Sequence, residues 1–177
     1  MLKGSTIMGV SAEDIKLLRE ETGCGVIDCK KALEESQGNR DKAKELLRKR
    51  GLEMALKKSD REVKEGRVEA YIHNGNKIGV VVEINCETDF VARSEDFITF
   101  SKDLAMHIAA MSPKYIKKED VPADVLAKEP DTKQYCLLQQ AYVKDASKSI
   151  QDYLNELVAK IGENIRVSRF VRFKVGE

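Results

Sequence analysis

The chain has 177 residues, of which 42% are hydrophobic and 34% are charged, which is enough apolar material for a core but too much charge for a membrane protein. No run approaches the roughly 18 apolar residues that a membrane-spanning helix needs. The formal net charge is only +1, with basic and acidic residues interleaved. This balance argues against a nucleic acid as the main ligand, because nucleic-acid binders usually carry a strong basic excess.

The first ten residues lack the apolar core and the cleavage site of a secretory signal, and they contain no arginine of a mitochondrial presequence. We therefore expect a disordered tail over residues 1–10 and a cytoplasmic protein. The four cysteines are then expected to be reduced. Because Cys24 and Cys29 have no second pair downstream and only two histidines are present, buried thiols are favoured over a zinc site, and neither a metal nor a cofactor is predicted.

Residues 11–52 are predicted to form a module of three short helices. Ser11 can cap the first helix, which carries Ile15 and Leu18 on one face. Glycines end the first and second helices, and Gly51 is expected to close the third. So small a bundle has a marginal core, and it is a recognition module more often than an enzyme.

Residues 53–65 are mostly polar and are predicted to be a linker, which leaves residues 66–177 as a second domain. There the apolar period changes from that of a helix to that of a strand. Two alternating runs flank a turn at Asn74 and Gly75, which predicts a β-hairpin with one buried face. The apolar residues that alternate are Val68, Ala70 and Ile72 in the first run and Ile78, Val80, Val82, Ile84 and Cys86 in the second.

Further helices follow the hairpin. Ser94 is expected to cap a helix that continues until Pro113, and Pro122 to start a short one. Residues 134–144 fit either a strand or a helix. Ser147 is then expected to cap an amphipathic helix that ends at Gly162.

The last alternating run, over residues 165–175, is predicted to join the hairpin as a third antiparallel strand. Its basic residues could meet phosphates, although such a row is more often the solvated face of a sheet. The fold class is therefore α+β: a three-helix module followed by an antiparallel three-stranded sheet packed with helices. One face should carry Ile165, Val167, Val171, Phe173 and Val175, and the other Arg166, Ser168, Phe170, Arg172 and Lys174.

The sequence contains no glycine-rich phosphate loop and no zinc-protease or hydrolase motif. Neither His73 nor His107 lies beside a candidate nucleophile, so structural or surface roles are expected and an enzyme is not. The strongest candidate for a functional site is the loop "NCETDFVARSEDF" at residues 85–97, in which Phe90 is surrounded by charged residues. Such a phenylalanine either packs under its own element or serves another protein.

Five stretches are together similar to the translation elongation factor Ts family, and they cover most of residues 11–177 in the family's order. The resemblance implies a guanine-nucleotide exchange factor that releases GDP from elongation factor Tu, with the helical module resembling a ubiquitin-associated domain. The stretches are "LREETGCGVIDCKKALEESQGNRDKAKELLRKRG", "GVVVEINCETDFVARSEDF", "KDLAMHIAAMSPKYIKKEDVPADVLAKE", "KIGENI" and "RFVRFKVG".

The resemblance also implies roles for single residues. In the helical module, contacts with the GTPase would come from Leu18, Val26, Ile27 and Lys30. The Mg²⁺ and phosphate region of the GTPase would be disturbed by Thr88, Asp89, Phe90 and Val91. Further contact positions match His73, Ile161 and Gly162. Asp89 would either hold the loop through a backbone N–H or act near the metal. Two rival hypotheses are an adaptor that uses the helical module alone and RNA binding through the basic strand.

Longer family members carry two related α+β subdomains, whereas this chain has one. The resemblance therefore implies a homodimer through the sheet domain. Short members can carry a cysteine in the last strand for an intersubunit disulfide, but Val171 occupies the matching position here, so only a non-covalent dimer is expected. The resemblance also implies that this chain lacks a helical stretch after "DVLAKE" that many family members carry.

Overall fold

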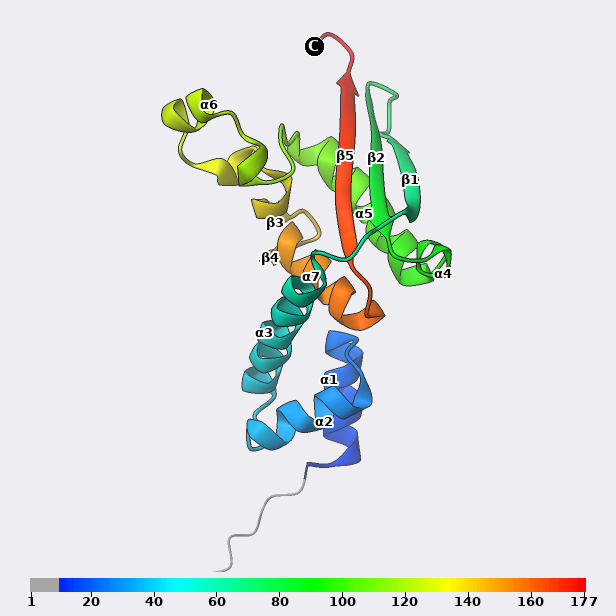
Figure 1. Cartoon of the computed structure of the whole chain (residues 1–177), viewed down its shortest axis with the longest axis vertical. Helices are drawn as coiled ribbons and strands as arrows, with labels where there is room; N and C mark the ends of the chain where they lie inside the picture. Colours follow the sequence, from blue (N-terminus) through cyan, green and yellow to red (C-terminus); the bar gives the residue numbers. More distant parts are fainter. Residues whose placement is uncertain (1–9) are drawn as a thin grey trace, which may run out of the picture.

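Figure 1 shows the chain as a computed structural model, which describes residues 10–177. Apart from Val10, the predicted tail over residues 1–10 lies outside this range. Within residues 10–177, no helix combines the length and the apolar character needed to cross a bilayer. The architecture is α+β, as predicted: a helical module lies at one end of the molecule and a three-stranded antiparallel sheet at the other.

Three helices, α1 (Ala12–Thr22), α2 (Val26–Glu35) and α3 (Arg40–Lys58), form the N-terminal module. Ser11 caps α1 in a reciprocal capping box, and Gly23 ends it at a φ of 67°, a conformation that favours glycine. The predicted first and last residues of α1 are thus confirmed. The likeness of the module to a ubiquitin-associated domain stays a prediction. The module's core consists of Leu18, Cys29, Ala32, Leu33, Ala43 and Leu47.

The predicted end of the third helix at Gly51 is wrong, because α3 continues for two more turns to Lys58. Gly51 lies against α7 (Ile150–Ile161), and a Cβ added to it would come within 3.3 Å of the Cβ of Ala159. A helical glycine costs about 1 kcal/mol relative to alanine, and the close approach of the two helices offsets this cost. Part of the predicted linker is therefore the end of α3.

The sheet has the order β1–β2–β5, with β1 (Glu65–Ile72), β2 (Ile78–Cys86) and β5 (Ile165–Lys174) all antiparallel. The turn between β1 and β2 contains Gly75 at a φ of 85°, which confirms the predicted hairpin. The third strand pairs with β2 as predicted.

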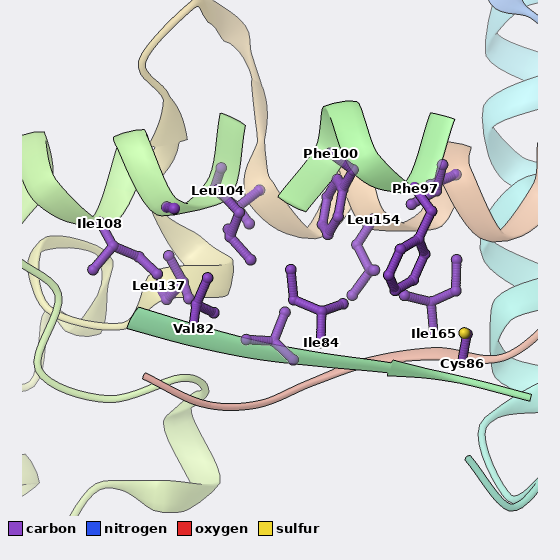
Figure 2. Packing of buried hydrophobic residues seen from close by; sticks show 14 of the residues in the cluster. Val82, Ile84, Cys86, Phe97, Phe100, Leu104, Ile108, Leu137, Leu154 and Ile165 are labelled. Atoms are coloured by element: carbon purple, nitrogen blue, oxygen red, sulfur yellow. The ribbon is translucent and has the colours of Figure 1, made fainter. Parts of the chain in front are cut away.

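One face of the sheet carries the core of the second domain. Helix α5 (Glu95–Met111), capped by Ser94 as predicted, packs on this face, and buried side chains of α7 join the same core. Figure 2 shows side chains of β2 and α5 meeting between the two elements, with Leu137, Leu154 and Ile165 completing the cluster. The fully buried residues of β2 and α5 in this cluster are Val80, Val82, Ile84, Cys86, Phe97, Phe100, Leu104, Ala105 and Ile108.

The other face of the sheet differs from the prediction. Val68 and Ile72 of β1 are exposed rather than buried, because β1 turns its other side to the helices. In β5 a register shift opposite Glu83 and Ile84 adds one residue, which reverses the alternation along the rest of the strand. Phe170 is therefore half-buried on the helical side, whereas Val171, Phe173 and Val175 are exposed.

The segment between α5 and α7 is irregular. The ambiguous residues 134–144 form neither a regular helix nor a long strand, but a short 3₁₀ turn (Leu137–Gln139) that leads into a two-strand ribbon. Ser149, rather than Ser147, caps α7, because Ser149 is followed at the third position by Asp152 and completes a capping box. The other short elements are α4 (Asp89–Ala92), α6 (Ala123–Lys128), β3 (Ala141–Tyr142), β4 (Asp145–Ser149) and 3₁₀ turns at Lys118–Asp120 and Thr132–Gln134.

Candidate functional site

The loop after β2 presents Phe90 to solvent. Thr88 caps the one-turn helix α4, and its side-chain oxygen accepts the backbone N–H of Val91. Phe90 is the second residue of α4, and its side chain is 83% exposed. An exposed ring of this size is not a plug of the local core, so the interpretation in which Phe90 packs under its own element is wrong.

Two neighbours of Phe90 anchor the loop. The side chain of Val91 packs on the main core, and the Ser94 hydroxyl donates to the Val91 carbonyl at 2.8 Å. Asp89 pairs with Arg93 one turn later on the same short segment, and both side chains remain more than half exposed. The Asp89 carboxylate is thus turned outwards in this structure and does not bond a backbone N–H of the loop.

Glu163 holds the start of this loop and was not predicted. Its Oε2 atom accepts the backbone N–H groups of Glu87 and Thr88 at 3.1 and 3.0 Å, and its Oε1 atom accepts the Thr88 hydroxyl at 2.6 Å. Glu163 lies within the "KIGENI" stretch, next to the predicted Gly162. Its sequence separation of 75 residues from Thr88 leaves no periodic signal that could have connected them.

The helical module offers a second exposed apolar patch at the N-terminus of α2. Ile27 is 68% exposed, Val26 lies exposed beside it, and Lys30 follows one turn on with an exposed side chain 3.8 Å from Glu34. Leu18 does not belong to this patch. It is fully buried in the module's core, so its predicted contact with a partner is not available at the surface of this structure.

The C-terminal end of α7 lies between the two candidate surfaces. An added Cβ at Gly23, in the loop before α2, would contact the Lys160 side chain at 3.4 Å, and Lys160 pairs with Asp96 in the first turn of α5 at 2.6 Å. Ile161 is half-buried against the core, and Gly162 ends the helix at a φ of 86°. The predicted residues Ile161 and Gly162 therefore lie close to the Phe90 loop, because Glu163, which follows them in the chain, bonds to Thr88 of that loop.

His73 is not brought to this site. It follows the last residue of β1, at the hairpin turn, whereas Cys86 ends β2 at the α4 side of the sheet. A strand of nine residues spans roughly 30 Å, so His73 lies at the opposite end of the sheet from Phe90. Its ring contacts the Tyr71 hydroxyl at 3.0 Å through Nδ1.

Comparison with known proteins identifies the family. The profile of the elongation factor TS family matches residues 26–134 and 131–177. The chain belongs to the elongation factor Ts family. It is 48% identical to elongation factor Ts of Caldanaerobacter subterraneus subsp. tengcongensis over 195 aligned positions, which cover 95% of this chain and 98% of that protein. It is likewise 48% identical to elongation factor Ts of Thermotoga neapolitana, with 96% and 99% of the two chains covered.

The alignment with a third elongation factor Ts, from Anaeromyxobacter sp. (strain K), shows 49% identity and covers 95% of this chain and 89% of that protein. Each of these alignments extends over 195 positions, although this chain has only 177 residues. The alignments therefore contain positions that this chain lacks, in agreement with the predicted absence of a stretch found in relatives. The family assignment agrees with the sequence resemblance.

The basic strand of this family member offers no free row of cations. Arg169 pairs with Glu83 at 2.6 Å, Lys174 with Glu177 at 2.6 Å, and Arg172 donates to the Ala109 carbonyl at 3.2 Å. Arg172 also lies on the helical side of the sheet, because of the register shift in β5. These contacts argue against a phosphate-binding row, although Arg172 and Phe170 do not lie on the predicted solvated face.

Buried titratable groups around this site have shifted pKa values. Cys86 lies at its base, and burial raises the pKa of this thiol to about 11, so it stays protonated near neutral pH. His107 is buried in α5, where burial lowers its pKa, and its Nε2 atom lies 3.0 Å from Oε1 of Gln140, away from the loop. In residues 10–177, no three His, Cys, Asp or Glu side chains are grouped to hold a metal ion.

Proposed function

We propose that this chain is a guanine-nucleotide exchange factor for elongation factor Tu and that it acts by binding rather than by catalysing a bond change. The observation that carries the proposal is Phe90, a large apolar side chain that is 83% exposed on a loop fixed to the core. Family membership supplies the partner, since relatives of this length are elongation factors Ts.

The physical requirement for exchange is a preference for the nucleotide-free GTPase. A GTPase holds GDP through a phosphate cradle and a Mg²⁺ ion that bridges phosphate oxygens to protein ligands. Binding of this protein lowers the affinity of the GTPase for GDP by some factor. By linkage, bound GDP lowers the affinity of the GTPase for this protein by the same factor. Contacts that form only when the Mg²⁺ region is displaced are therefore the ones that promote release.

Phe90 can supply apolar burial in a pocket of the partner, and Asp89 can supply a charged group near the metal. Burial of one aromatic ring contributes roughly 1.5–3 kcal/mol, and the ring on α4 reaches this burial only when a pocket opens in the partner. The exposed Asp89 carboxylate can exchange Arg93 for a group of the partner near the metal. The surface around Val26 and Ile27 would hold the GTPase by the helical module while the loop acts.

The test is release of a fluorescent GDP analogue from elongation factor Tu, with the wild-type protein and the Phe90→Ala variant in parallel. We expect the wild type to accelerate release and the variant to bind with a rate enhancement reduced by on the order of tenfold or more. If neither protein accelerates release but both bind, the rival adaptor function, which uses only the helical module, replaces this proposal. If both accelerate release equally, the factor is an exchange factor in which Phe90 is not the wedge.

We also propose a non-covalent homodimer through the sheet. The face of the sheet that carries no helix is mostly apolar apart from the Glu83–Arg169 pair, and helix α5 lies behind the strands in Figure 1. Cross-strand neighbours on this face include Val81 with Val171 and Ile72 with Gly79. An apolar patch of contiguous strand residues marks an interaction surface more often than a solvated face. The exposed apolar residues are Val68, Ile72, Val81, Val171, Phe173 and Val175.

A further inference from the structure

Two corners of the fold meet where β2 and β5 stop pairing. Cys86 and Ile165 form the last pair of the ladder between these strands. Beyond it, Glu87 and Thr88 lead into α4, and Glu163 and Asn164 come from the end of α7. No backbone ladder holds the two corners together there, so side chains must do so.

Each corner is held by a carboxylate from the other. Glu163 accepts the N–H groups of Glu87 and Thr88 and the Thr88 hydroxyl. In the opposite direction, Glu87 Oε1 accepts the backbone N–H of Asn164 at 2.6 Å. Hydrogen bonds to an ionised carboxylate are shorter and roughly twice as strong as those between neutral groups. We call this reciprocal pair, Glu163 and Glu87, the carboxylate clasp.

The carboxylate clasp is also connected to the end of α3. Lys58 donates to the carbonyl of Gly162, and the Asn164 side chain donates to the carbonyls of Ser59 and Arg61 at 3.2 and 2.8 Å. Helix α3 begins in the helical module and has 19 residues, a length of roughly 28 Å. A single rigid helix thus leads from the module to the corner that holds the Phe90 loop, as Figure 1 shows.

We propose that Glu163 is a positioning residue for nucleotide exchange: it fixes Thr88, the cap of α4, so that Phe90 projects at a set place relative to the helical module. The inference rests on the proposed exchange function. Glu163 itself is half-buried in the corner and acts on the partner only through the loop. The maximal rate of GDP release therefore depends on Glu163, whereas the affinity contributed by Val26 and Ile27 does not.

The decisive experiment measures release of fluorescent GDP from elongation factor Tu as a function of the concentration of the exchange factor. Glu163→Ala is expected to lower the maximal rate by on the order of tenfold, with less than about a twofold change in the half-saturating concentration, because misplacing a reacting group by about 1 Å can cost up to a hundredfold. Glu163→Gln, which keeps one carbonyl oxygen for the two N–H groups, should recover part of the rate. If the alanine variant does not fold, the glutamine variant alone carries the comparison.

Glu156→Ala is the matched control. Glu156 lies on α7, the helix that precedes Glu163, and pairs with Lys148 at 2.7 Å, but it has no hydrogen bond or ion pair to the loop, so its removal should leave the release curve unchanged. Circular dichroism of each variant confirms that helix content is retained. A fall in rate for Glu156→Ala equal to that for Glu163→Ala would overturn the proposal.

A double variant separates positioning from general destabilisation. In the Phe90→Ala background, Glu163→Ala should cause little further loss, because both changes act through the same ring. Additive losses would overturn the proposal, as would a raised half-saturating concentration with an unchanged maximal rate. If the wild type accelerates release and Glu163→Ala equals it, only the positioning role fails. If the wild type does not accelerate release, the proposed function fails first.

Discussion

Leu18 and Ile27 show how differently two apolar residues of one small module are used. Both match positions at which relatives are expected to contact the GTPase. Leu18 is fully buried among the helices, whereas Ile27 is 68% exposed at the start of α2. The helical period of the sequence placed Leu18 on one face with Ile15, and its burial agrees with that pattern, whereas its contact with the GTPase stays a prediction.

The two residues should therefore respond oppositely to truncation. Leu18→Ala is expected to lower the free energy of unfolding of the module by about 2–5 kcal/mol through cavity formation. Ile27→Ala should change it by less than about 0.5 kcal/mol but raise the half-saturating concentration in GDP release. Urea denaturation and release assays on both variants check this. If Ile27→Ala leaves the half-saturating concentration unchanged, the N-terminus of α2 lies outside the interface.

His107 gives the fold a dependence on pH that is separate from that of the carboxylates. Its Nδ1 atom accepts the Val143 N–H at 3.3 Å, so Nε2 carries the proton and donates to Gln140. The Tyr142 ring lies beside it, 6.3 Å between centroids. Burial lowers the pKa of His107 below its usual value of 6.5. Just below pH 6.5 the unfolded chain therefore binds more protons than the folded one.

Stability is thus expected to be independent of this group above pH 6.5 and to fall as the pH drops from 6.5 towards the lowered pKa, by up to about 1.4 kcal/mol per pH unit. Hydrogen bonds from basic side chains lower the pKa of Glu21 and Glu83, so these carboxylates lose their contribution only below about pH 4.5. Urea unfolding from pH 7.5 to 5 measures the slope. A His107→Gln variant with the same slope would show that another group causes it.

At the scale of elements, local signals located helices and strands well and failed where a contact between distant elements decided the outcome. The cap at Ser94, the turn at Gly75 and the strand period of β2 are local, and all were predicted. The extra residue in β5 has no local signal, and it exchanges the faces of Phe170 and Phe173. Glu163 escaped prediction for the same reason, since its partners are distant in sequence.

Gly51 is the clearest case of an element set by its neighbour. Its hydrogen faces Ala159 of α7, where an added Cβ would lie 3.3 Å from the Cβ of Ala159 and 3.7 Å from the Asn155 carbonyl oxygen. Gly51→Ala gains about 1 kcal/mol in helix propensity and loses a similar amount to the tight contact, so a small net change is expected. Gly51→Leu should lower the free energy of unfolding by about 1–3 kcal/mol, because the larger side chain separates α3 from α7.

Thermal and urea unfolding of the two variants measure this difference. Since α3 connects the module to the corner held by Glu163, Gly51→Leu should also lower the maximal rate of GDP release, whereas Gly51→Ala should not. Leucine tolerated at position 51 without loss of stability would mean that α3 and α7 can separate freely. In that case α3 would not fix the position of the helical module relative to the corner held by Glu163.

At the scale of the whole molecule, the candidate contact surfaces are distributed over different sides. The α2 patch and the Phe90 loop lie near the C-terminal end of α7, whereas the open sheet face is covered by no helix. A dimer through the sheet is thus compatible with binding of a GTPase by each copy. The family resemblance predicted the dimer, but only the structure shows which residues are available for it, because the register shift in β5 decides that Val171 and Phe173 face outwards.

The dimer can be tested by molecular mass alone. Light scattering at micromolar concentration should give about 40 kDa, twice the 19.9 kDa of one chain. Phe173→Asp places a charge on the apolar face, where its burial without a partner would cost several kcal/mol, so this variant should be monomeric. Ile27→Asp is the matched control, because it adds the same charge at an equally exposed apolar site, 68% in both cases, and should stay dimeric. A wild-type mass near 20 kDa would reject the dimer, and equal dissociation by both variants would show that the sheet face is not the interface.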